Sequence, residues 1–153
     1  MKKIASFTVN HDTLEKGMYI SRIDGDIVTY DIRMKKPNNN DFLENAAMHT
    51  FEHLFATYAR NTELASNVIY IGPMGCRTGF YFLVRDSITH EQSLKLLQDC
   101  FEFVKNFDSE IPGTKKEECG NYLEHNLQGA KDIATDMYEV LKNWTVEKMT
   151  YAK

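Results

Sequence analysis

Alternating apolar and polar residues predict a β-hairpin near the start of the chain. Two β-rich runs, Met18–Ile23 and Ile27–Met34, are separated by an Asp-Gly turn signal, which is typical of a hairpin. Successive side chains of a strand point to opposite faces, so Thr29, Asp31 and Arg33 share the polar face of the second run. We therefore expect Arg33 to lie outside the core. The opposite, apolar face consists of Val28, Tyr30, Ile32 and Met34.

Capping signals and helical periodicity predict three helices. Asp41 with Glu44 three residues later is a capping-box variant, so a helix is expected from there to about Arg60. Thr89 with Gln92 is a second capping box and opens the next helix. The apolar stripe of that helix is Leu94, Leu97, Phe101 and Val104. The last helix carries Ile133, Met137, Val140, Leu141 and Trp144.

A second strand pair, Val68–Ile71 and Phe80–Val84, is expected between the first two helices. The segment between these strands, 72–79, holds three glycines and a proline and predicts an irregular turn. Strands followed by helices mixed with further strands favour the α+β class, with an antiparallel sheet packed against helices. No repeat, low-complexity tract or flexible linker divides the chain, so we interpret residues 1–153 as a single domain.

Composition narrows the classes of function. The chain has 153 residues, 42% hydrophobic and 26% charged, which is the globular range. A net charge of -4 argues against nucleic acid as a partner, because a duplex binder needs a basic face. No apolar run approaches the roughly 20 residues that span a bilayer, so no membrane role is expected. An odd count of three cysteines and no visible signal peptide favour a cytoplasmic protein with free thiols.

The segment His49-Thr50-Phe51-Glu52-His53 is the sharpest chemical signal. Two histidines four residues apart share one helical face and can reach a single metal ion. Glu52 points toward the same face and can act as a base beside the metal. This HxxEH order is the inverted zinc motif. The alternative is two solvent-facing histidines and a glutamate in this order by chance.

A catalytic metal site usually has three protein ligands and one open position. The candidates for the third ligand are Cys76, Cys100, Cys119, His11, His90, His125 and several acids. Cys100 lies within an apolar stripe, which favours a core position. Cys119 lies in a polar stretch before the last helix, where a thiolate would be a good ligand. The residues alone leave it equally open whether Cys119 is a ligand.

Cys76 lies in the glycine-rich turn and is followed by Arg77. Glycines let the backbone approach a ligand closely, and a nearby cation favours the thiolate. Cys76 is therefore a candidate acid, base or nucleophile. The alternative is a small residue in a tight turn, and composition does not separate the two.

Taken in order along the chain, these segments resemble the S-ribosylhomocysteine lyase (LuxS) family. The resemblance covers nearly the whole chain. The matching segments are Ser6–His11, Tyr30–Arg33 with Pro37-Asn38, His49–Leu54, Pro73–Tyr81, and Cys119-Gly120 with His125, Leu127 and Ala130.

The resemblance implies roles for the metal-binding and proton-transfer residues. His49, His53 and Cys119 would bind one divalent metal per chain, with Fe²⁺ favoured and Zn²⁺ or Co²⁺ able to replace it. Glu52 and Cys76 would be the paired general acid/base groups.

The resemblance also implies how substrate is held. Arg33 would lie near Cys76 and keep it anionic, while Ser6 and His11 would contact the ribosyl part of the substrate. Family members are homodimers with sites at the subunit interface, where the N-terminal segment of one chain reaches the site of the other.

The implied reaction is cleavage of S-ribosylhomocysteine to homocysteine and 4,5-dihydroxy-2,3-pentanedione, the autoinducer-2 precursor. The carbonyl would migrate along the sugar through enediolates before β-elimination. The sequence contains no nicotinamide or flavin fingerprint. Whether the product serves quorum sensing or only the activated methyl cycle is not encoded in these residues.

Two positions depart from the family pattern. Tyr70-Ile71-Gly72 stands where the family often has Asp-Ile-Ser, and Lys35 stands where a cysteine is frequent. Neither is a proposed ligand or proton-transfer residue, so the resemblance predicts the reaction type more firmly than the substrate affinity. Two other functions are considered: a metal hydrolase, disfavoured because such enzymes are longer, and a metal-stapled interaction domain, which would normally have four protein ligands.

Overall fold

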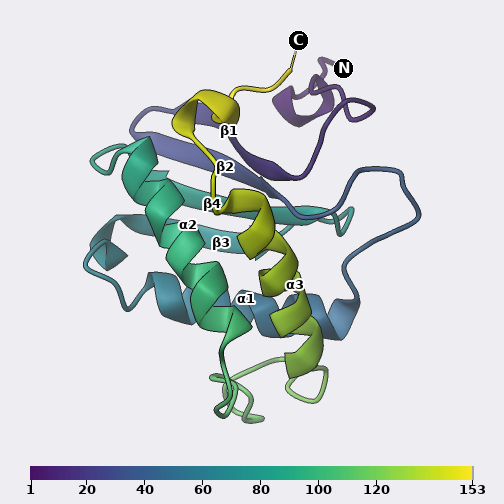
Figure 1. Cartoon of the computed structure of the whole chain (residues 1–153), viewed down its shortest axis with the longest axis vertical. Helices are drawn as coiled ribbons and strands as arrows, with labels where there is room; N and C mark the ends of the chain where they lie inside the picture. The colour runs from purple at the N-terminus through teal and green to yellow at the C-terminus, as the bar shows by residue number, and fades with distance from the viewer. Residues whose placement is uncertain (153) are drawn as a thin grey trace.

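Four antiparallel strands form one sheet in the computed structural model, which describes residues 1–152 (Figure 1). The strands lie in the order β1-β2-β4-β3. Their bounds are Gly17–Asp24 for β1, Ile27–Arg33 for β2, Val68–Pro73 for β3 and Gly79–Arg85 for β4. Three helices lie against one face of the sheet: α1, Asn45–Ala59; α2, His90–Lys105; and α3, Leu127–Leu141. Short 3-10 turns occur at η1, Ala5–Phe7; η2, Ala65–Asn67; and η3, Val146–Met149. The predicted α+β class is confirmed.

Both predicted hairpins are confirmed. Asp24 pairs with Ile27 across the first turn, where Gly25 has a φ of 60° that suits a glycine. Tyr30 and Ile32 on β2 are fully buried beneath the helices.

The opposite face of β2 is also buried, which the strand pattern alone does not indicate. Arg33 lies on that face as predicted, but only 4% of it is exposed, and Asp31 is 2% exposed. Both chain ends lie at this side of the molecule (Figure 1). Residues of both ends, among them Ser6 and Tyr151, line a cavity together with Arg33.

The capping box of α2 forms as predicted. The Thr89 hydroxyl accepts from the Gln92 amide, and the Gln92 side chain accepts from the Thr89 amide. The four residues predicted to form its apolar stripe are all buried. Cys100 on the same helix is fully buried, which confirms it as a core residue.

The predicted start of α1 is wrong. Glu44, not Asp41, is the N-cap, and its carboxylate accepts from the Ala47 amide at 2.6 Å. The Leu43 amide already donates to the Arg77 carbonyl, so the chain before Glu44 is held against the β3–β4 turn instead of joining the helix.

The end of the last predicted helix also differs. α3 ends at Leu141, so Trp144 lies beyond it and donates its indole N–H to the Met18 carbonyl at 3.0 Å. Met137 and Leu141 are fully buried as expected of the apolar face.

Packed aromatic rings join α1 to the sheet and to α2. Phe51 of α1 lies 5.2 Å from Phe80 of β4 and 5.6 Å from Phe101 of α2, measured between ring centroids. All three are fully buried, so this packing fixes the position of α1, the helix that carries His49 and His53. Across residues 1–152, no helix is long and apolar enough to cross a membrane.

Candidate metal centre and cysteine cavity

His49 and His53 lie one turn apart on α1 with their rings 4.6 Å apart. The Nδ1 atom of His49 is 2.7 Å from the Glu124 carbonyl, and that of His53 is 2.8 Å from the Pro112 carbonyl. A carbonyl only accepts, so each Nδ1 carries the proton and each Nε2 has a free lone pair. This outer hydrogen bond is the usual support of a metal-binding imidazole.

Cys119 comes from the irregular segment between α2 and α3. Its Sγ lies 3.4 Å from His49 Nε2 and 3.9 Å from His53 Nε2. The Asn121 amide donates to the same sulfur at 3.4 Å. The structure therefore brings together the three side chains predicted as ligands.

His125 joins these three residues. One ligand atom from each of His49, His53, Cys119 and His125 lies within 4.8 Å of the others. The His125 ring stacks on His49 at 4.1 Å, and its Nδ1 lies 2.8 Å from the Thr50 hydroxyl. Its Nε2 is buried and has no hydrogen-bond partner within residues 1–152, as expected of an atom placed to face a metal. Burial lowers the pKa of His125, and His49 and His53 lower it further, so the ring is held neutral.

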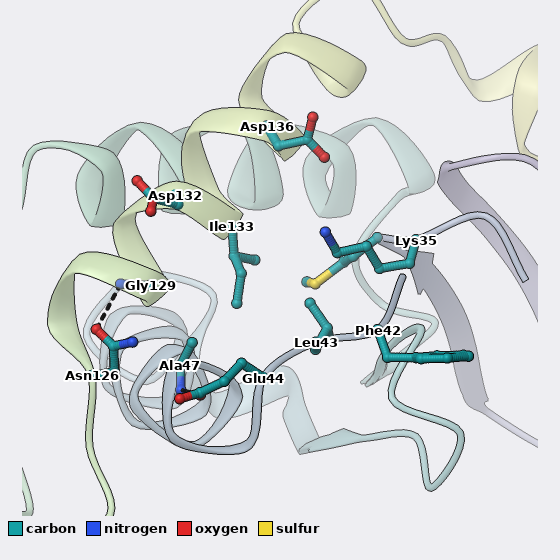
Figure 2. A pocket seen from close by; sticks show the side chains of 11 residues that line it. Lys35, Phe42, Leu43, Glu44, Ala47, Asn126, Gly129, Asp132, Ile133 and Asp136 are labelled. Atoms are coloured by element: carbon teal, nitrogen blue, oxygen red, sulfur yellow. Dashed lines mark hydrogen bonds between the residues drawn. The ribbon is translucent and has the colours of Figure 1, made fainter. Parts of the chain in front are cut away.

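Sequence reasoning considered His125 but did not select it, because no helical spacing links it to the other ligands. Its position depends on the start of α3. Asn126 is the N-cap, with its side chain accepting from the Gly129 amide at 2.9 Å (Figure 2), and the Asn126 amide donates to Thr50. These two bonds hold Asn126 against α1, and with it the preceding residue, His125.

A glycine allows the loop to reach His53. Gly113 has a φ of 75°, and a Cβ there would meet His53 Nδ1 at 2.9 Å. A larger residue would therefore be strained and would push the Pro112 carbonyl from His53.

The donor set fits a transition metal. Imidazole nitrogens and one thiolate suit ions such as zinc or iron, whereas magnesium and calcium prefer oxygen ligands. The four side chains therefore fit one divalent metal. Glu52 lies half-buried on the same helix and is not among the four clustered residues.

A separate cavity of about 260 Å³ lies on the other face of the sheet. It gathers four of the predicted site residues: Ser6, His11, Arg33 and Cys76. Cys76 is exposed at the β3–β4 turn, so its sulfur is accessible to a ligand in this cavity.

A buried network connects Arg33 to Cys76. Arg33 donates Nη2 and Nε to Asp31 at 2.7 and 3.1 Å, and Nη1 to the Thr78 hydroxyl at 2.8 Å. The Thr78 oxygen is 3.0 Å from Cys76 Sγ. Arg33 therefore acts on Cys76 through one intervening hydroxyl.

Arg77, the cation next to Cys76 in the sequence, points elsewhere. It has a φ of 61°, donates to the Leu43 carbonyl at 3.1 Å and lies over the Phe42 ring. The cation linked to Cys76 is instead Arg33, which lies far away in sequence at the end of β2.

The metal cluster and the cysteine cavity are separate within one chain. Neither Glu52 nor any of the four clustered residues lines the cavity. The green loop that carries Cys119 lies at one end of the molecule, and both termini lie at the other (Figure 1). Ser6 and Cys119 are thus not brought together by the fold of a single chain.

A second hollow, of about 220 Å³, lies between α1, α3 and the loop before α1 (Figure 2). Its lining includes Lys35, Glu44, Asp132 and Asp136 but none of the predicted catalytic, metal-binding or substrate-binding residues. We therefore place the candidate chemistry at the metal cluster and the cysteine cavity.

Known proteins are similar to this chain over nearly its whole length. The sequence model of the family S-Ribosylhomocysteinase (LuxS) matches residues 4–148. An S-ribosylhomocysteine lyase of Phocaeicola vulgatus is 45% identical, over 99% of this chain and 98% of the relative. Proteins of the same name from Clostridium acetobutylicum and Porphyromonas gingivalis are 44% and 45% identical, over 99% of both chains in each case. The chain belongs to the S-ribosylhomocysteinase (LuxS) family.

Proposed function

We propose that this chain is a metal-dependent carbon–sulfur lyase that cleaves S-ribosylhomocysteine to homocysteine and 4,5-dihydroxy-2,3-pentanedione. The observation that carries the proposal is the convergence of His49, His53 and Cys119 beside Glu52 in a member of this family. The relatives named above carry the same activity in their names.

His49, His53 and Cys119 hold one divalent metal in this proposal. Their mixed nitrogen and sulfur donors accept Fe²⁺, Zn²⁺ or Co²⁺. Fe²⁺ is the favoured ion, as the family resemblance implies. When bound, the metal supplies Lewis-acid polarisation of the substrate carbonyl.

Glu52 and Cys76 move the protons. Each migration of the carbonyl by one carbon needs a proton taken from carbon and another delivered, so two groups that exchange protons are required. After two migrations the carbonyl is at C3, and removal of the C4 proton expels homocysteine from C5. Arg33 stabilises the Cys76 thiolate through Thr78.

In this proposal the substrate binds in the cavity that Cys76 lines. Ser6 and His11 line it beside Cys76 and offer hydrogen bonds to the hydroxyls of a ribosyl group. Tyr81 also lines the cavity and supplies an aromatic wall.

We further propose a homodimer in which the metal cluster of one protomer faces the cysteine cavity of its partner. The separation of the two regions in one chain supports this arrangement, because Glu52 and Cys76 must reach the same substrate. The N-terminal segment that carries Ser6 then serves the partner's metal cluster.

The test is release of homocysteine. Protein purified without oxygen and loaded with about one metal per chain is mixed with S-ribosylhomocysteine, and free thiol is followed with a colorimetric reagent. Glu52→Gln and Cys76→Ala are each expected to lower turnover by about 100-fold or more, with metal content unchanged. Glu63→Gln, an exposed residue in the loop after α1, is the matched control and keeps full activity.

Absence of homocysteine from folded, metal-loaded protein would overturn the proposed function. Full turnover in Glu52→Gln would leave the reaction intact and remove Glu52 from it.

A second candidate is a closed structural metal site. His125 favours it, because four protein ligands leave no position for substrate. Cobalt-loaded protein separates the two: an open site changes its visible absorption when S-ribosylhomocysteine is added, whereas a closed site does not. His125→Ala would lower metal affinity at least tenfold if His125 is a ligand.

A further inference from the structure

The end of the chain lies over the outer face of the sheet. The tail follows η3 and passes beside β1, close to the N-terminal segment (Figure 1). The Tyr151 ring stacks on Tyr19, with centroids 5.1 Å apart and an interplanar angle of 20°. Tyr19 and Asp31 are direct partners in the β1–β2 ladder, so Tyr151 lies above this pair.

Tyr151 donates its hydroxyl to Asp31 Oδ2 at 2.6 Å. The buried Asp31 carboxylate therefore accepts three hydrogen bonds, one from Tyr151 and two from Arg33. Burial raises the pKa of Tyr151 far above its ordinary range, and the negative charge of Asp31 adds to the effect. The phenol therefore stays protonated and keeps its role as a donor.

Packing fixes the path of the tail. Trp144 donates to the Met18 carbonyl and meets Tyr19 edge-on, with centroids 5.8 Å apart. A Cβ on Gly17 would come within 2.3 Å of the Trp144 ring, so a glycine is needed for this close approach. The tail is thus anchored before it reaches Tyr151.

We propose that Tyr151 is a positioning residue for the cysteine half of the site. Its hydroxyl orients Asp31, Asp31 holds Nε and Nη2 of Arg33, and the remaining Nη1 is directed to Thr78 beside Cys76. Tyr151 also lines the same cavity as Cys76. This role rests on the proposed function only where it concerns turnover.

Tyr151 lies outside the region that the family model matches. The match to the family model ends at residue 148, and no motif covers the tail. From outside the matched region, Tyr151 supplies the third donor to the buried Asp31 carboxylate. Without that donor, the buried Asp31 carboxylate lacks one hydrogen-bond donor, so it draws Arg33 closer to itself and away from Thr78.

The first measurement needs no substrate. Iodoacetamide modifies thiolates, and mass spectrometry of the Cys76 peptide gives the rate at that residue alone. Tyr151→Phe removes only the hydroxyl and is expected to slow Cys76 alkylation about threefold near neutral pH, because Arg33 stabilises the thiolate less. Tyr138→Phe on α3, a tyrosine that does not line this cavity, is the matched control and leaves the rate unchanged.

A double-mutant cycle tests the route through Thr78. Thr78→Val removes the hydroxyl between Arg33 and Cys76, so Tyr151→Phe should have no further effect on alkylation in that background. Equal slowing by Tyr151→Phe in both backgrounds would overturn the positioning route. Thermal melting of each variant confirms that the comparison is made on folded protein.

Turnover gives the last readout. Tyr151→Phe is expected to lower kcat about fivefold with little change in KM, as for a group that orients a reacting residue. Alkylation and kcat indistinguishable from those of Tyr138→Phe would overturn the proposal. Slower alkylation in Tyr151→Phe, with no homocysteine released even by the wild type, would instead contradict the lyase function and leave the positioning role standing.

Discussion

Removal of the metal should loosen one segment of the chain and leave the rest intact. The segment from Phe107 to Asn126 has no regular helix or strand, and none of its residues is fully buried. Apart from the contacts of the Cys119 sulfur, its hydrogen bonds to α1 are four: His49 to the Glu124 carbonyl, His53 to the Pro112 carbonyl, and Thr50 to both the His125 ring and the Asn126 amide. A metal bound by Cys119 is therefore expected to add to this attachment.

The size of the effect follows from these contacts. Four hydrogen bonds contribute about 1 kcal/mol each, so the metal-free segment is held by only about 4 kcal/mol. A metal at 100 times its Kd adds about 2.7 kcal/mol, which is a factor of roughly 100 in the opening equilibrium. Chelation should thus raise amide exchange in this segment about 100-fold.

Hydrogen exchange measured by mass spectrometry resolves the segment from the sheet. Peptides covering β2 and β4 should show the same protection with and without chelator, because the aromatic core does not depend on the metal. Cys119→Ala should reproduce the chelated pattern without chelator. Unchanged protection of the segment after complete metal removal would refute this reasoning, as would an equal loss of protection in the sheet.

Three further predictions concern stability and the metal site. Gly113→Ala should lower metal affinity about tenfold in a competition assay with a chromophoric chelator, because it strains a φ of 75° and displaces the Pro112 carbonyl from His53. Phe51→Ala should cost about 3–5 kcal/mol in urea unfolding, since it empties a fully buried site between Phe80 and Phe101; a loss below about 1 kcal/mol would contradict this packing. Burial raises the pKa of the Cys100 thiol well above its ordinary value of 9.0. The unfolded chain therefore loses this proton at a lower pH than the folded chain, and the free energy of unfolding falls above about pH 9. Urea titrations at several pH values check this, and Cys100→Ala should lose less stability at alkaline pH than the wild type.

Local signals predicted most of the fold, because they depend on neighbouring residues. The Thr89 capping box and the Asp-Gly hairpin satisfy their own hydrogen bonds within a few residues. The start of α1 could not be found in this way. Asp41 and Glu44 both suit an N-cap, and the choice is made by the Arg77 carbonyl, which holds Leu43 from the far β3–β4 turn.

In the candidate site, too, local features could be predicted from the sequence and long-range contacts could not. The sequence predicted that His49 and His53 lie close together because both residues lie on one helix. His125 and the Tyr151 contact depend on how a loop and a tail fold back, and no local pattern encodes that. Arg33 was placed on the polar face correctly, but its burial comes from residues at both ends of the chain. Arg77 shows the opposite case. It follows Cys76 in the sequence, but its side chain donates to the Leu43 carbonyl and does not reach Cys76.

In the proposed function, S-ribosylhomocysteine is cleaved at a site that combines Glu52 and the metal cluster of one protomer with the Cys76 cavity of its partner. The most direct test mixes two inactive variants, Glu52→Gln and Cys76→Ala, under conditions that exchange subunits, and measures homocysteine release. Random pairing makes half of the dimers mixed, each with one intact site, so the account predicts about a quarter of wild-type activity. No activity after demonstrated subunit exchange would contradict a site divided between two protomers.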